Sequence, residues 1–238
     1  MKKERLTKRL ALFTALTLTG AMLAGCGNTD AAESSSDAQT GVTADTQAAA
    51  GDASADVVYR TLDEIKESGT INIGVFSDKN PFGYVDENGE YQGYDVYYAR
   101  RLGEDLGVDV NFVSTEAANR IEYLQTGKVD VILANFTVTP ERAEEVDFAA
   151  PYMNVALGVV SKDDNVITTL DNWNADDSII VISGTTAETY LIANYPDIPL
   201  QKFDSYATAK EAFENGTSVA WANDNTEVIA FALQNEGY

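Results

Sequence analysis

The sequence has no histidine and a single cysteine among its 238 residues. Without histidine there is no imidazole base, no histidine metal ligand and no side chain whose ordinary pKa lies between 5 and 8. With one cysteine, no disulfide can form within the chain. Histidine-assisted catalysis and histidine-based metal sites are therefore excluded.

Basic residues are also scarce: 16 Lys and Arg stand against 38 Asp and Glu, a net charge of -22. Residues 1–25 hold five of the basic residues, so the remainder has 11 basic and 37 acidic residues, a charge of -26. Such a chain repels nucleic acid and anionic lipid headgroups, and we expect no nucleic-acid partner. The simplest interpretation of the acidity is a solvated surface.

No apolar run is long enough for a comfortable bilayer span. A basic segment, MKKERLTKR, precedes a 14-residue apolar run at residues 10–23, where a spanning helix needs about 20. The run ends in LAGC, residues 23–26, which resembles the bacterial lipobox. We therefore expect a lipoprotein signal peptide at residues 1–25 and lipidation of Cys26, which would anchor the chain to the cell membrane outside the cytoplasm. The alternative is an ordinary signal peptide with a chance cysteine.

Residues 28–56 are a low-complexity stretch of Ala, Ser, Thr, Asp and Gly with one valine and no aromatic residue. Such a segment cannot bury enough apolar surface to fold. We interpret residues 26–56 as the lipidated cysteine and a flexible tether, followed by one lobe at 57–153 and a second at 154–238.

Strand-like and helix-like segments alternate from residue 57 onward, which predicts an α/β fold with parallel sheets. We expect strands at residues 70–76, 108–113, 129–134, 178–183, 200–203 and 218–222. We expect helices at residues 60–69, 95–106, 116–127, 140–146, 185–195, 208–216 and 225–235, and a loop with a small hairpin at 80–94. The expected helix caps are Thr61 with Glu64, Gly69, Asp95, Gly107 and Thr139, the last followed by Pro140 at the first helical position.

Two segments that follow expected strands have the chemistry of a binding site, ANFTVTPER at 134–142 and ISGTTAET at 182–189. Ligands of open α/β sheets bind outside the carboxyl ends of strands, so a ligand between two lobes is expected. For a trial α-amino acid, Arg142 is the right bidentate donor for the carboxylate. The helix start at Gly184 offers N–H groups from the opposite side, and Asp224 offers an acid for the ammonium.

Each of these residues has a plainer interpretation. Arg142 could pair with Glu141 or Glu145 on its own helix, and Arg120 could be a surface residue. Thr139, Thr185, Thr186 and Asp224 could be helix caps or turn residues, and Phe76 could belong to the core.

The segments NPFGYVDENGEYQGYDV, LQTGKVDVILANFTVTPERAEEVDFAAPYM and GTTAETY resemble, in order and spacing, the polar amino-acid substrate-binding proteins of ABC importers. Within that family, EAANR, ILANFTVTPERAE and PYMNVALGVV are most similar to cysteine-binding lipoproteins. The resemblance covers residues 57–238 and implies a two-lobed periplasmic-binding-protein fold of type II. Relatives continue past the position of Tyr238, so we expect both lobes to be incomplete at the C-terminal side.

The resemblance also implies which residues bind the ligand. It assigns the ligand carboxylate to Arg142, Thr137 and the backbone at Thr185 and Thr186. It assigns the ammonium to Asp224 and to the backbone oxygen near Asn135.

Two further positions bear on the ligand side chain. Arg120 lies where relatives specific for aspartate and glutamate have a side-chain-binding arginine. Those relatives have a lysine where this chain has Phe76, which suggests a less basic pocket and a small ligand such as cysteine. Relatives that clamp large side chains have an aromatic residue where this chain has Ala117, so such a clamp looks half missing.

We therefore expect a monomeric, lipid-anchored receptor that closes on an L-amino acid, cysteine by preference, and presents it to an ABC permease without cofactor or covalent chemistry. Three alternatives stay open. They are a binding protein for aspartate or glutamate, an amino-acid sensor domain, and an extracytoplasmic dehydratase with Glu116 or Glu188 as general acid or base.

Overall fold

The computed structural model describes residues 59–238. The expected signal peptide, the lipidated Cys26 and the tether lie outside these residues. Within the described part, no helix is both long enough and apolar enough to cross a bilayer.

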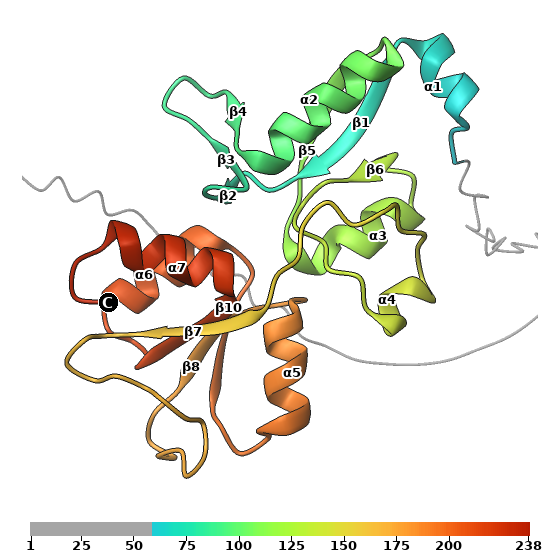
Figure 1. Cartoon of the computed structure of the whole chain (residues 1–238). Coiled ribbons are helices and arrows are strands. Elements are labelled where there is room, and N and C mark those ends of the chain that lie inside the picture. The colour runs from blue at the N-terminus through green and yellow to red at the C-terminus, as the bar shows by residue number, and fades with distance from the viewer. Residues whose placement is uncertain (1–58) are drawn as a thin grey trace, which may run out of the picture. The chain divides into compact units, whose positions relative to one another are not determined.

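The first half of the described chain is built on a three-stranded parallel sheet in the order β5-β1-β6. Strand β1 is central because its alternate residues Ile71, Ile73 and Val75 are buried against α2. We call the elements α1 to α4 the β1 half (Figure 1). Its main elements are α1 (Leu62–Ser68), β1 (Thr70–Val75), α2 (Tyr94–Leu106), β5 (Asp109–Ser114), η1 (Ala117–Asn119), α3 (Arg120–Gln125), β6 (Val131–Ile132) and α4 (Pro140–Ala143).

The expected hairpin is part of a small antiparallel sheet between β1 and α2. Its strands are β2 (Asp78–Lys79), β3 (Gly83–Val85) and β4 (Tyr91–Gln92), in the order β2-β3-β4. The turn at Asn88 and Gly89 joins β3 to β4, and Val85 pairs with Tyr91.

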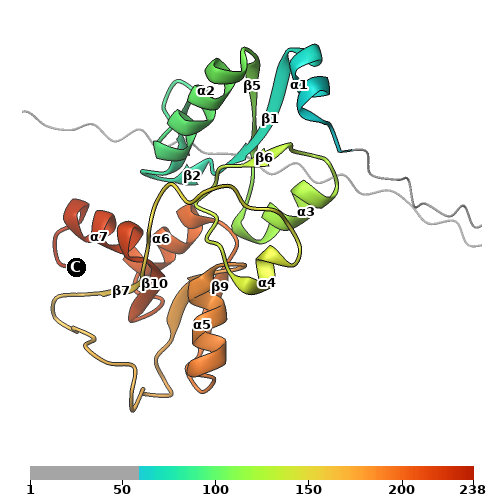
Figure 2. The same cartoon turned by 45° about the vertical axis from the view of Figure 1, so that its right-hand side comes forward.

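The second half has a four-stranded sheet in the order β7-β10-β8-β9. Strands β10, β8 and β9 are parallel, whereas β7 runs antiparallel to β10. We call the elements β7 to α7 the β8 half, and Figure 2 shows its helices around the sheet. Its elements are β7 (Leu157–Ser161), β8 (Ile179–Ile182), α5 (Thr186–Asn194), β9 (Leu200–Phe203), α6 (Tyr206–Glu214), β10 (Ala220–Asp224) and α7 (Asn225–Gln234).

The α/β fold with parallel sheets and flanking helices is confirmed. The sheets are parallel-rich and not wholly parallel, because β7, which follows α4 in the chain, runs antiparallel to β10. The strand expected at residues 129–134 is paired only at Val131 and Ile132. After Leu133, whose N–H still donates to the Gly74 carbonyl, the chain turns at Asn135 with φ +45°.

Most expected caps are confirmed. Thr61 and Glu64 form a reciprocal capping box, Gly69 and Gly107 end their helices in the left-handed conformation, and Thr139 caps α4. The cap at Asp95 is wrong, because α2 begins at Tyr94 and the Asp95 side chain is buried.

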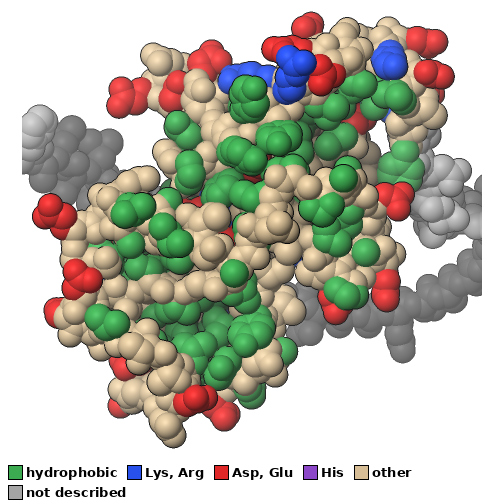
Figure 3. Space-filling view, in the orientation of Figure 1, with side chains coloured by type: hydrophobic (Ala, Val, Ile, Leu, Met, Phe, Trp, Pro, Cys, Tyr) green, Lys and Arg blue, Asp and Glu red, His purple; other side chains and the backbone are tan. Residues whose placement is uncertain are grey.

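Three apolar clusters hold the fold together. One lies under the β1 sheet, one lies under the β8 sheet, and the third joins the halves. In the third, the Phe76 ring meets the Tyr206 ring edge-on at 5.1 Å between centroids. The face seen in Figure 3 carries apolar side chains over both halves.

Gly93 joins the small sheet to α2 in a conformation that only glycine adopts readily. Its φ is +121°, and a Cβ built on it meets the Phe82 carbonyl oxygen and lies 2.8 Å from the Pro81 carbonyl oxygen. The Tyr94 and Asp95 N–H groups donate to those same two carbonyls, so this close backbone approach fixes the start of α2.

We expect Gly93→Ala to lower the free energy of unfolding by about 2–4 kcal/mol, because it adds a steric clash to an unfavourable φ. The matched control is Gly89→Ala, where φ is +82° and nothing lies within 4 Å of the added Cβ. There only the backbone penalty of about 1–2 kcal/mol applies. Urea unfolding measures both, and equal losses for the two variants would contradict the close-approach argument.

Candidate ligand-binding site

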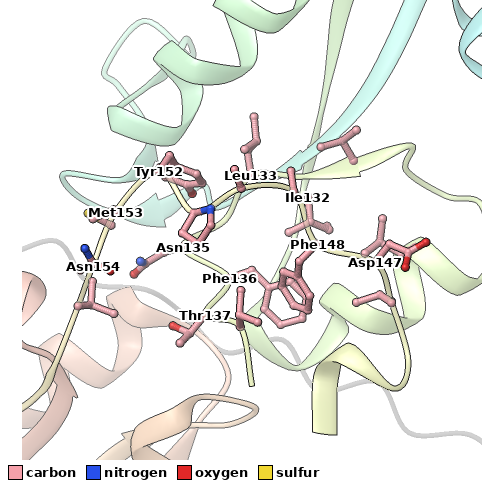
Figure 4. Close-up of a pocket in the computed structure, with 18 of the residues that line it drawn as sticks. Ile132, Leu133, Asn135, Phe136, Thr137, Asp147, Phe148, Tyr152, Met153 and Asn154 are labelled. Carbon is pink, nitrogen blue, oxygen red and sulfur yellow. The ribbon is translucent and has the colours of Figure 1, made fainter. Parts of the chain in front are cut away.

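The segment that follows β6 is held rigidly by side chains from elsewhere in the β1 half. The Asn135 N–H donates to the Asp95 carboxylate at 2.8 Å, and the Tyr152 hydroxyl donates to the same carboxylate at 2.8 Å. Burial raises the pKa of Asp95, opposed by these two hydrogen bonds. Asp95 thus acts as an internal support for the strand end, which Figure 4 shows with Asn135 and Tyr152 labelled.

Arg142 lies in α4, whose N-cap Thr139 accepts a hydrogen bond from the Arg142 N–H. Its guanidinium donates to the Thr137 carbonyl at 2.7 Å and to the Gly184 carbonyl at 2.9 Å. Two of its five guanidinium N–H groups are thereby used, and the other three have no partner among the described residues. No ion pair with Glu141 or Glu145 forms, so the plainer interpretation of Arg142 is wrong.

Arg120 is buried at 3% exposure and is not the surface residue of the plainer interpretation. Its guanidinium donates to the carbonyls of Ala117, Ala134, Asn135 and Gly184 at 2.9–3.2 Å. Burial lowers the pKa of Arg120 to about 10, so the group stays charged at neutral pH. Four of its five N–H groups go to backbone oxygens, which leaves one for anything else.

The Phe136 ring contacts both guanidinium groups. The distance from its centroid is 4.4 Å to the central carbon of Arg120 and 4.7 Å to that of Arg142. The Phe148 ring packs against Phe136 at 5.2 Å, and Figure 4 shows the two rings side by side. Cation–π contacts of this kind fix both arginines without consuming N–H groups.

The start of α5 faces these arginines from the β8 half. Thr185 is its N-cap, and the hydroxyl accepts from the Glu188 N–H and donates to the Ile182 carbonyl. The side chain of Thr185 is therefore satisfied as a cap. The N–H groups of Thr186 and Ala187 have no partner in the described part of the chain, and the helix dipole favours an anion beside them.

Gly184 is a point of close backbone contact between the two halves. Its carbonyl oxygen accepts from both Arg120 and Arg142, and a Cβ built on it lies 2.6 Å from the Ala118 Cα. Its φ is +76°. Only a residue without a side chain permits this contact between α5 and η1.

Asp224 ends β10 at the N-cap position of α7, but its side chain makes no capping hydrogen bond. It lies 3.5 Å from the ammonium of Lys79, which also donates to the Asn135 side-chain oxygen at 2.7 Å. Lys79 was not among the candidates, because a lysine beside Asn80 and Pro81 is typical of an exposed turn.

Phe76 is fully buried, as its plainer interpretation supposed. The Lys79 ammonium lies 5.5 Å from the centroid of its ring. The premise that Phe76 makes this region less basic therefore does not hold, because Lys79 supplies a cation from three residues along the chain.

Four buried polar atoms within three residues of Asp224 along the chain have no hydrogen-bond partner in the described residues. They are the side-chain atoms Trp221 Nε1, Asn223 Nδ2, Thr226 Oγ1 and Glu227 Oε2. Burial raises the pKa of Glu227 to about 7, opposed by the nearby Lys79. No group of three or more Cys, Asp and Glu side chains in residues 59–238 has the arrangement of a metal site.

The structure thus brings Arg120, Arg142, Asn135 and the Thr137 carbonyl together against Gly184. It also places Asp224 and Lys79 beside Asn135. The hydroxyls of Thr137 and Thr186 make no hydrogen bond in the described part, and Thr185 acts as a cap. A hollow of about 440 Å³ lies next to this group and includes Asn135 and Thr137 but neither arginine in its lining (Figure 4). It is lined by Leu124 and residues 130–133, 135–138 and 146–155.

The chain is similar to known proteins whose names describe amino-acid binding. The crystal structure of the solute receptor for L-cysteine of Neisseria gonorrhoeae is 51% identical with a TM-score of 0.73, covering 75% of this chain and 73% of that one. The cysteine-binding protein of Campylobacter jejuni is 47% identical with a TM-score of 0.69, covering 73% of this chain and 71% of that one. The ABC transporter glutamine-binding protein GlnH of Bacillus subtilis is 29% identical over 192 residues, 79% of this chain and 70% of the relative.

The model of the bacterial extracellular solute-binding proteins, family 3, matches residues 71–232, which include every residue of the site described above. The chain therefore belongs to the bacterial extracellular solute-binding proteins, family 3.

Proposed function

We propose that this protein is the substrate-binding component of an ABC importer and that its ligand is an amino acid, L-cysteine by preference. Family membership supports the class. The two structures at 51% and 47% identity, both described as receptors or binding proteins for cysteine, favour this ligand over glutamine.

One observation carries the proposal. Among the described residues, the Arg142 guanidinium keeps three N–H groups without a partner and faces the start of α5, where two backbone N–H groups are also unpartnered. A carboxylate is the group that a planar donor and a helix N-terminus bind together. The Asp224 carboxylate and the Asn135 carbonyl supply acceptors for an ammonium, so the pair suits a zwitterion.

Binding requires no covalent step. In the proposed mechanism the ligand enters between the halves, Arg142 binds its carboxylate from the β1 half, and α5 binds it from the β8 half. The Gly184 contact then forms as the halves close, and the closed form is what a permease recognises.

The hydrogen bonds of Arg120 bear on the alternative ligands. An arginine that binds a side-chain carboxylate needs two parallel N–H groups, whereas Arg120 has one left after its four backbone contacts. This disfavours aspartate and glutamate. The dehydratase alternative loses Glu188, whose carboxylate accepts from the Gly184 N–H and pairs with Lys202. Lipidation of Cys26 and recognition by a permease stay predictions, as do the lobe boundaries and a monomeric state.

We expect the full chain to be stabilised by L-cysteine under reductant more than by any other common amino acid. A ligand at about a hundred times its dissociation constant adds about 2.7 kcal/mol, which corresponds to roughly 5–10 °C in a domain of this size. A thermal-shift screen with calorimetric titration measures both. A chain that melts cooperatively but responds to no amino acid would contradict the proposed function, and a larger shift with glutamate would contradict the choice of cysteine.

We expect Arg142→Lys to weaken cysteine binding by roughly a hundredfold, because a lysine ammonium cannot reproduce the bidentate geometry. The matched control is Arg101→Lys on α2, where the arginine is exposed and pairs only with Glu104 and Asp105. Calorimetric titration gives the two affinities. An Arg142→Lys variant that binds as well as the control would remove the carboxylate assignment.

We expect Gly184→Ala to weaken ligand binding by roughly tenfold or more, because the new methyl group clashes with Ala118 only when the halves are closed. Gly216→Ala is the control, since Gly216 has φ +73° with only the end of the Lys162 side chain nearby. Both variants lose similar folding stability through the backbone, so the expected difference is in affinity. Equal affinities would show that the contact is not part of closure.

A further inference from the structure

Lys79 is the most deeply buried lysine of the described chain, with 1% of its surface exposed. It lies in β2 of the small sheet, and its ammonium is surrounded by the rings of Phe76, Phe82 and Tyr206. The ammonium lies 4.6–5.5 Å from the three ring centroids. A lysine is almost never buried to this degree unless its charge is paired, because the charge must be taken out of water.

The ammonium is held by groups from both halves. Asn135 of the β1 half accepts a hydrogen bond from it, and Asp224 of the β8 half is its ion-pair partner. Burial alone would lower the pKa of Lys79, but Tyr206, Glu227 and Asp224 outweigh it and the pKa is raised. Lys79 is therefore a fixed positive charge inside the closed molecule.

Its position matters because Asn135 and Asp224 are the residues to which the proposed function assigns the ligand ammonium. Lys79 and the ligand ammonium would share one carboxylate, each within a few ångströms of it. The γ atom of an amino-acid ligand is separated from its own ammonium by only two carbon atoms. The ligand side chain therefore starts within reach of the Lys79 ammonium.

We propose that Lys79 determines side-chain specificity: its ammonium accepts ligands whose side chain offers a hydrogen-bond acceptor, and it rejects ligands with a cationic side chain. The inference rests on the proposed function and extends it to the side chain. The charged residues around the site are consistent with this role of Lys79. Three buried or half-buried cations, Lys79, Arg120 and Arg142, face the carboxylates of Asp95 and Asp224, with Glu227 close to its midpoint at neutral pH.

The test uses two pairs of ligands that differ in one group. L-cysteine and L-2-aminobutyrate have the same shape, with a methyl group in place of the thiol. L-norvaline and L-2,4-diaminobutyrate have the same length, with an ammonium in place of the terminal methyl group. Calorimetric titration of the full chain at pH 7 under reductant gives the affinity ratio within each pair, which cancels the contribution of the shared carboxylate and ammonium.

For the unsubstituted chain we expect cysteine to bind roughly tenfold or more tightly than 2-aminobutyrate, and diaminobutyrate to bind more weakly than norvaline by a similar factor. In Lys79→Met, which conserves length and apolar volume, both ratios should fall to within about threefold of unity. Lys79→Arg should keep the rank order, because it keeps the charge. Lys66→Met is the control, since Lys66 is exposed in the last turn of α1.

Failure of the proposed function and failure of the role of Lys79 give different results. If the unsubstituted chain melts cooperatively but binds no amino acid, the proposed function fails and this inference fails with it. If it binds amino acids but shows no preference within either pair, or if Lys79→Met weakens all four ligands equally, Lys79 only supports closure and the inference is overturned. If Lys79→Met does not fold, Lys79→Gln, which also removes the charge but keeps a polar end, takes its place: both ratios should again fall toward unity, and ratios equal to those of the unsubstituted chain would overturn the inference.

Discussion

One carbonyl oxygen, that of Gly184, accepts hydrogen bonds from two guanidinium groups of the opposite half. Such an arrangement is possible only because the oxygen has two lone pairs and because Gly184 allows its backbone to touch Ala118. The Phe136 ring contacts both guanidinium groups. The remaining features of the site, including the support of Asn135 by Asp95, serve to place these three partners.

The two arginines that bind the Gly184 carbonyl have different roles. Arg120 is bound to four backbone carbonyls and acts as a structural brace across the two halves. Arg142 makes two such bonds and keeps the rest of its capacity for an anion. An arginine can thus have a structural or a ligand-binding role, according to the number of carbonyl groups that surround it. The residue type alone does not decide between the two roles.

Much of the fold could be predicted from the sequence because it depends on local signals. The capping box at Thr61, the terminating glycines and the apolar strands identified the elements to within a few residues. The antiparallel β7 could not be recognised, because alternation of strands and helices says nothing about a strand that enters from the other half. The segment around Arg142 and Gly184 could be recognised because strand ends with hydroxyls, glycine and arginine are rare in an acidic chain.

The buried charges could not be predicted in the same way. Lys79 stands in a turn-like stretch, and its burial depends on Asn135 and Asp224, which are 56 and 145 residues away in the sequence. Asp95 did leave a signal that was misinterpreted. It lies four and eight positions before Ala99 and Gly103, so it belongs to the buried stripe of α2 and not to its cap.

Both tryptophans of the chain, Trp173 and Trp221, belong to the β8 half. Trp221 lies in the same strand as Asp224, is 1% exposed, and packs against Phe213 and Phe231 with its indole N–H unpartnered. Selective excitation of tryptophan therefore produces fluorescence from the β8 half only. Because the emission of an indole depends on the electric field around it, Trp221 is a natural optical reporter of charge arriving beside Asp224, whereas the half that carries both arginines is silent at that wavelength.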